Sequence, residues 1–290
     1  MSKVSVITDS NSGITQEQAK DLGITVLPMP FFINGEEYKD GVTLDQDTFY
    51  NMLEKGYDVA TSQPSGGELI EVWDEALKTS DEVIYIPMSS GLSSTVQTAI
   101  TFAEDYDGKV CVADNQRISV TQRYSAIEAK KMADKGASAL EIKNFLEATK
   151  FDSSIYIMVD TMKYLKKGGR VTPAAATIAE ILNIKPVLQI QGEKLDSFAK
   201  ARGIHAAKKI MINAIKNDVE KRFGGIDPEN PKVEIEVAHS HNPEAADTLA
   251  MELKEIFPNH HIHVDPLSLS VSCHIGPGSL AIATSVIHDI

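Results

Sequence analysis

The sequence predicts an α/β protein of two domains, the first of them a three-layer α/β/α domain around a parallel sheet. Short β-rich runs alternate with helical patterns through the first half of the chain, as in DEVIYIPM followed by SSTVQTAITFAEDY, and such alternation is typical of parallel sheets covered by helices. The chain has 290 residues, enough for two cores. The pattern changes near Asp160, so we expect domains at residues 1–160 and 161–290, the second also α/β.

Helix starts in the first domain are marked by capping-box spacing, in which a serine or threonine precedes a glutamate or glutamine by three residues. A glycine at position 23 is placed to end the first of these helices. Three pairs have the spacing: Thr15 with Gln18, Ser65 with Glu68, and Ser94 with Gln97.

The net charge and the apolar content of the sequence indicate which classes of binding partner are disfavoured. With 28 basic and 41 acidic side chains the net charge is −13, the wrong sign for binding nucleic acid or an anionic membrane surface. We find no apolar run long enough for a membrane helix and no secretory signal pattern, so we expect a cytoplasmic protein without an integral membrane segment. Cys111 and Cys273, the two cysteines, are expected to be thiols.

A hydroxyl-rich turn, IPMSSGLSSTVQ, lies between a predicted strand and a predicted helix. Ligands of open α/β sheets lie beyond the carboxyl ends of the strands, where a helix start offers N–H groups and partial positive charge. If Ser94 caps the helix, then Ser89, Ser90 and Ser93 remain available for a small anion. The turn lacks the spacing of a phosphate loop and of a hydrolase elbow. An alternative stays open, in which the hydroxyls cap the helix and close the loop.

Two further segments carry candidate binding residues. VATSQPSGGELIEVW places Thr61 and Ser62 before a second helix start, and two such starts fit the polar end of a shared pocket. HIGPG places His274 before a loop stiffened by proline, which predicts an imidazole presented by a strand end. A surface histidine in an ordinary turn is the alternative.

Other reactive side chains predict no catalytic or metal centre. Cys273 and His274 are neighbours and would point to opposite faces of a strand, which disfavours a thiol–imidazole pair. The histidines in AHSHN and NHHIH could form a metal site, but histidines in such segments more often lie on the surface without a metal. We therefore expect no catalytic residue, metal or cofactor.

Several segments taken together resemble the DegV family of bacterial fatty-acid-binding proteins: VITDSNSGI, TSQPS, IPMSSGLSSTVQTA, MKYLKKGGRVTPAAATIAEILNIKPVLQI and HIGPG. They follow the order of the family over nearly the whole chain. The resemblance implies a long-chain fatty acid, such as palmitate, stearate or oleate, in a buried pocket between the two domains. It also implies that Thr61, Ser62 and Ser93 hold the carboxylate, with His274 nearby.

The resemblance further implies a carrier and not an enzyme. In one branch of the family the bound acid is presented to an ATP-dependent fatty acid kinase, which makes the acyl phosphate, and Arg170 in KKGGR resembles an arginine near the exposed end of the ligand. The alternative is a hydrolase or transferase that acts on an acyl or phosphorylated small metabolite at the same pocket.

Overall fold

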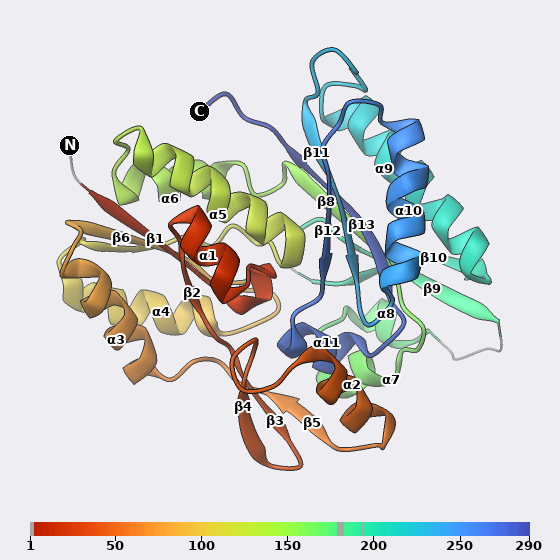
Figure 1. Ribbon diagram of the computed structural model, residues 1–290, viewed down its shortest axis with the longest axis horizontal. Coiled ribbons are helices and arrows are strands. Elements are labelled where there is room, and N and C mark those ends of the chain that lie inside the picture. Colours follow the sequence, from red (N-terminus) through yellow and green to blue (C-terminus); the bar gives the residue numbers. More distant parts are fainter. Residues whose placement is uncertain (1–2, 179–182, 193) are drawn as a thin grey trace. The chain divides into compact units, whose positions relative to one another are not determined.

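The computed structural model describes residues 3–178, 183–192 and 194–290 (Figure 1). The chain forms two compact units. The first unit contains the residues up to Asp45, Asp58–Lys150 and Ile290, and the second contains Gln46–Tyr57 and Phe151–Asp289. The domain limits 1–160 and 161–290 that the sequence suggests stay a prediction.

A four-stranded parallel sheet in the order β2-β1-β6-β7 is the centre of the first unit. Its strands are β1 (Val4–Asp9), β2 (Thr25–Leu27), β6 (Glu82–Ile86) and β7 (Val110–Val112). Its helices are α1 (Gln16–Leu22), α3 (Gly66–Leu77), α4 (Thr95–Ala103), α5 (Ser119–Asp134) and α6 (Ala139–Ala148), with short 3₁₀ turns η1 (Ser10–Ser12) and η2 (Glu104–Tyr106). The predicted α/β class and parallel sheet are confirmed.

Both faces of this sheet are buried, as the three-layer prediction requires. Along β6, Ile84 and Ile86 pack in one apolar cluster with residues of α1, α5 and α6. Val83 and Tyr85 alternate with them and pack in the opposite cluster with residues of α3 and α4. The helices accordingly lie in two layers, one on each side of the sheet (Figure 1).

A small antiparallel sheet completes the first unit, in the order β4-β3-β5. Its strands are β3 (Pro30–Ile33), β4 (Glu36–Lys39) and β5 (Val59–Thr61). Pro30 occupies the first position of β3, where the missing N–H costs least. The strands β4 and β5 are too short to give a periodic signal in the sequence.

The second unit contains a six-stranded mixed sheet in the order β10-β9-β8-β13-β11-β12. Its strands are β8 (Ser153–Met158), β9 (Ile184–Ile190), β10 (Asp196–Arg202), β11 (Val233–His239), β12 (Ile262–Pro266) and β13 (Leu280–Val286). Its helices are α2 (Gln46–Glu54), α7 (Lys163–Gly168), α8 (Pro173–Ala176), α9 (Ile204–Arg222), α10 (Pro243–Ile256) and α11 (Leu269–Ile275). Apolar residues of α9 and α10 form one core with those of the sheet.

Candidate functional site

The segment with Thr61 and Ser62 continues the small antiparallel sheet. Thr61 ends β5 and pairs with Phe31 of β3, and the backbone N–H of Ser62 donates to the Pro30 carbonyl at 3.3 Å. The side chain of Thr61 is partly buried and that of Ser62 is exposed. Both hydroxyls are therefore mounted on backbone that a sheet holds in place.

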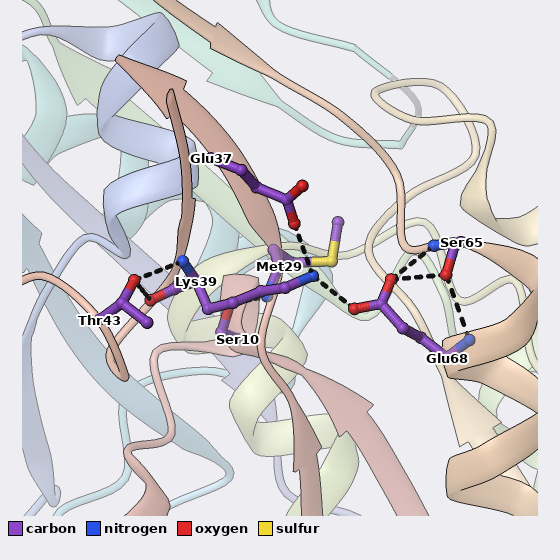
Figure 2. A network of polar contacts seen from close by, with 7 residues as sticks. All are labelled: Ser10, Met29, Glu37, Lys39, Thr43, Ser65 and Glu68. Carbon is purple, nitrogen blue, oxygen red and sulfur yellow. Dashed lines mark hydrogen bonds and ion pairs between the residues drawn. The ribbon is translucent and has the colours of Figure 1, made fainter. Parts of the chain in front are cut away.

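The same segment is fixed at its other end by a polar network at the start of α3 (Figure 2). Ser65 and Glu68 form the predicted capping box, with Ser65 N and Oγ both 2.8 Å from Glu68 Oε2. Lys39 of β4 contacts Glu68 and lies 3.2 Å from a Glu37 oxygen. Burial acts to raise the pKa of Glu68, but the hydrogen bonds from Lys39 and Ser65 outweigh it and lower the pKa. Thr61–Ser65 is thus held by a sheet on one side and by a charged cap on the other.

The hydroxyl-rich turn, residues 87–94, begins where β6 ends and is pinned through its backbone. Three successive N–H groups donate to two other segments of the first unit: Met88 to Asp9 Oδ2 at 2.9 Å at the end of β1, and Ser89 and Ser90 to the Arg117 carbonyl at 2.9 Å and Asp114 Oδ1 at 3.2 Å in the loop after β7. The turn is therefore a fixed part of the sheet edge, and these three N–H groups are used inside the protein.

The predicted availability of the serine hydroxyls is wrong in part. Ser89 Oγ accepts the N–H of Gly91 at 3.2 Å, and Ser90 Oγ donates to Asp114 Oδ2 at 2.6 Å. Ser93 Oγ accepts the N–H of Thr95 at 3.2 Å and lies 2.8 Å from Thr95 Oγ1. Ser93 thus takes the capping role at the first turn of α4, and its partly buried hydroxyl keeps capacity for a further bond, since a hydroxyl has one donor and two acceptor sites.

The predicted capping box of Ser94 and Gln97 is also wrong. Ser94 has φ −78° and ψ 1°, away from the extended backbone that a capping side chain needs, and it makes no side-chain cap bond. Its hydroxyl donates instead to Gln63 Oε1 at 2.8 Å, and Thr98 donates to the same oxygen at 3.1 Å. Gln63 therefore joins the TSQPS segment to the hydroxyl-rich turn, a role that its place inside TSQPS could have suggested.

Asp9 is a second residue that sequence reasoning undervalued. It ends β1, caps η1 and is fully buried. Besides the N–H of Met88, its carboxylate accepts the backbone and side-chain N–H groups of Asn11 at 3.0 and 2.9 Å and Gln122 Nε2 at 3.1 Å. Burial raises the pKa of Asp9 to about 6, although these hydrogen bonds act to lower it.

In the second unit, His274 lies in the last turn of helix α11, so the prediction that a strand end presents it is wrong. Ser268 caps this helix by accepting the N–H of Val271, and Gly276, with φ 76°, ends it. The physical cause is local, because a serine cap and a glycine stop make a short helix out of a segment whose apolar alternation suggested a strand. Cys273 and His274 are consequently neighbours on a helix.

Two glycines let α7 and α11 approach closely around His274. A Cβ on Gly168 would lie 2.1 Å from His274 Nδ1, and one on Gly276 would lie 2.3 Å from the ring of Tyr164. Arg170 follows α7 and donates to the Gly168 carbonyl at 2.5 Å. Burial, together with the smaller effect of the positive charges of Arg170 and Lys167, lowers the pKa of His274 to about 4. His274 is therefore a neutral imidazole at pH 7.

Helix α11 is also tied to α2, a contact that spans more than two hundred residues of sequence. Tyr50 of α2 donates to Ser272 Oγ at 2.7 Å, and its ring stacks on His241 with 4.5 Å between centroids. Gln46 donates to the Leu267 carbonyl at 3.0 Å. These contacts fix the helix that carries His274, and no short-range sequence signal could have revealed them.

The remaining sequence hypotheses concern metals, thiols and membranes. Within residues 3–178, 183–192 and 194–290, no group of three or more His, Cys, Asp or Glu side chains could hold a metal ion. Cys111 lies on β7 and Cys273 lies buried in α11, and both are thiols. None of the helices described is long and apolar enough to cross a bilayer.

Comparison with known proteins gives matches over nearly the full length. Residues 3–286 match the family model described as "Uncharacterised protein, DegV family". A DegV domain-containing protein of Clostridium perfringens is 31% identical, covering 97% of each chain. A fatty-acid-binding DegV family protein of Thermus thermophilus is 28% identical with a TM-score of 0.89, covering 98% of this chain and 100% of that one. DegV of Bacillus subtilis, a fatty acid binding protein, is 27% identical with a TM-score of 0.87, covering 99% and 100%.

We predict that His274 stays neutral down to about pH 4 and that Arg170→Gln raises its pKa toward the ordinary 6.5, without reaching it because burial is the larger cause. Since the folded-state pKa is lowered, the unfolded chain binds this proton more tightly, and His274 contributes stability above pH 6.5 that is lost as the pH falls toward 4. NMR titration of the imidazole measures the pKa directly. Lys209→Gln, an exposed lysine of α9, is the control and should leave it unchanged.

Gly168→Ala should displace the His274 imidazole, because the new methyl group would overlap Nδ1. We expect changed chemical shifts of His274 and lower stability, whereas alanine at a helical glycine ordinarily gains about 0.5–1 kcal/mol. Gly67→Ala is the matched control, since Gly67 is helical and its nearest neighbour would be 4.0 Å away. An unshifted imidazole in Gly168→Ala would contradict the close approach.

Proposed function

The chain belongs to the DegV family, and from this premise we propose that it binds a single long-chain fatty acid and serves as a carrier without turnover of its own. The observation that carries the proposal is the similarity, over 98% of the chain or more, to two proteins described as fatty acid binding. We assign the carboxylate to Thr61, Ser62 and Ser93 of the first unit and to His274 of the second.

The residue types suit a carboxylate that must be released again. A buried carboxylate is costly unless it receives hydrogen bonds, and hydroxyl groups donate them without forming an ion pair. A neutral His274 can likewise donate one N–H, and the low pKa of its imidazole keeps it uncharged. The rigid mounting of Thr61 and Ser93 supports the assignment, because prearranged donors bind a ligand at lower entropic cost.

The acyl tail would supply most of the binding free energy. Each buried methylene contributes about 0.8 kcal/mol, so a chain of about sixteen carbons gains on the order of 10 kcal/mol before ordering costs. The sequence offers LPMPFFI and TIAEILNIKPVLQI as apolar walls. Met29, Phe31 and Ile33 of the first segment are buried. Residues 179–182 of the second lie outside the described residues.

We further propose that the protein presents the bound acid to an ATP-dependent fatty acid kinase and that Arg170 takes part in this contact. Its side chain is only partly buried and lies on the loop that also shapes the surroundings of His274. An arginine suits recognition of phosphate because its planar guanidinium donates two parallel hydrogen bonds.

The carboxylate assignment predicts that Ser93→Ala and His274→Ala each weaken palmitic acid binding about tenfold, because each leaves the carboxylate with one donor fewer. If both side chains bind one carboxylate, the double variant should deviate from the product of the single effects. Calorimetric titration of delipidated protein measures all four affinities. The control is Thr101→Ala, which removes an exposed hydroxyl from α4, the helix that follows Ser93. Unchanged affinity of the double variant for palmitic acid would contradict the proposed carboxylate site.

The kinase proposal predicts that Arg170→Ala slows acyl-phosphate formation by a fatty acid kinase supplied with the loaded protein and ATP, while palmitic acid affinity stays within about twofold. Acyl phosphate is trapped with hydroxylamine and quantified against time. Lys209→Ala serves as the control for lost surface charge. Equal rates for wild type and Arg170→Ala would remove Arg170 from the proposal.

A further inference from the structure

We propose that Asp9 is a positioning residue for fatty acid binding, because its buried carboxylate holds the Met88 N–H and so places the hydroxyl-rich turn that carries Ser93. The inference rests on the proposed function and adds a residue that does not itself touch the ligand.

The contact lies at the carboxyl edge of the parallel sheet. Asp9 is the last residue of β1, and β6 runs parallel beside it and ends at Ile86, two residues before Met88. Asp9 Oδ2 accepts the Met88 N–H at 2.9 Å, and Asn11 Nδ2 lies 3.0 Å from the sulfur of Met88. The first residues of the turn are thus held by the neighbouring strand end.

Helix α5 also contributes to the contact between Asp9 and the start of the turn, through Gln122. Gln122 Nε2 donates to Asp9 Oδ1 at 3.1 Å, to Thr8 Oγ1 at 3.0 Å and to the Ile86 carbonyl at 3.2 Å. Thr8 Oγ1 also donates to the Ile86 carbonyl at 2.8 Å. Both Gln122 and Thr8 are fully buried. Asp9 therefore belongs to a network that fixes the distance between the ends of β1 and β6.

The position of the Met88 N–H determines the position of the hydroxyls beyond it. The N–H groups of Leu92 and Ser93 donate to the Ser89 carbonyl at 3.0 and 3.1 Å, so Ser93 is tied by hydrogen bonds to the residue that follows Met88. The first hydrogen bond that holds the turn is the one from the Met88 N–H to Asp9, two residues after the end of β6. A shift at Met88 would consequently be carried to Ser93.

Asp9 places a carboxylate where burial disfavours its charged form. Burial raises the pKa of Asp9 more than its hydrogen bonds lower it. Residues that cost stability while fixing a geometry are typical of functional sites. Asp9 offers two acceptor oxygens to N–H donors on both sides, which asparagine of the same size cannot do.

The test compares palmitic acid with 1-hexadecanol, both presented to delipidated protein in the same non-ionic detergent. In Asp9→Asn the amide NH₂ would face an N–H donor, so the turn should lose the first of its three backbone anchors while the apolar contacts stay. We expect palmitic acid to bind about tenfold more weakly and the alcohol to bind within about twofold of wild type. Amide hydrogen exchange of residues 88–93 should become faster in the same variant.

Asp218→Asn is the matched control. Asp218 is a buried carboxylate of the second unit that accepts the Tyr156 hydroxyl at 2.8 Å and Gln191 Nε2 at 3.2 Å. Its replacement alters a comparable buried acceptor that makes no hydrogen bond to the turn, and it should leave the preference for the acid over the alcohol unchanged. If Asp9→Asn does not fold, Asp9→Ser, which keeps an oxygen acceptor, is measured by the same criteria.

The outcomes separate this inference from the proposed function. Equal weakening of the acid and the alcohol in Asp9→Asn, or no weakening of either, would overturn the positioning role while wild-type binding leaves the proposed function standing. A wild-type protein that binds neither compound contradicts the proposed function, and the role of Asp9 falls with it.

Discussion

A polar turn can lie at the edge of a buried parallel sheet only if its backbone N–H groups find acceptors, because an unpaired buried N–H costs as much as a lost hydrogen bond. The first unit meets this constraint with side chains and carbonyls from other segments. Asp9, Asp114 and the Arg117 carbonyl each accept one N–H at the start of the turn after β6. These bonds use the first three N–H groups of the turn inside the protein, so the proposed carboxylate contact of the turn rests on the hydroxyl of Ser93.

The second unit reaches the same rigidity through close packing. Gly168 and Gly276 let α7 and α11 approach until side chains fill the space that a Cβ would need. The result is a half-buried imidazole among positive charges, held neutral by burial and by Arg170 and Lys167. In the proposed function, a neutral imidazole would donate a hydrogen bond to the carboxylate without forming an ion pair.

The fold class could be predicted from the sequence because alternation of strands and helices is a local signal, and the apolar residues of β6 show why it succeeds. The resemblance of TSQPS, SSGLSS and HIGPG to one family likewise located the candidate residues in the chain. Capping was predictable where the backbone is extended, as at Ser65, and failed at Ser94, whose hydroxyl is drawn to Gln63. Asp9, Gly168 and Tyr50 were missed because their partners are distant in sequence or lie in close packing that no spacing pattern records.

The most direct test of fatty acid binding is native mass spectrometry of the purified protein, followed by denaturation and identification of any released lipid. One long-chain fatty acid for each chain is the predicted result, and its length and unsaturation would define the preference of the site. A protein that is empty as purified and also fails to take up added palmitic or oleic acid would contradict the proposed function.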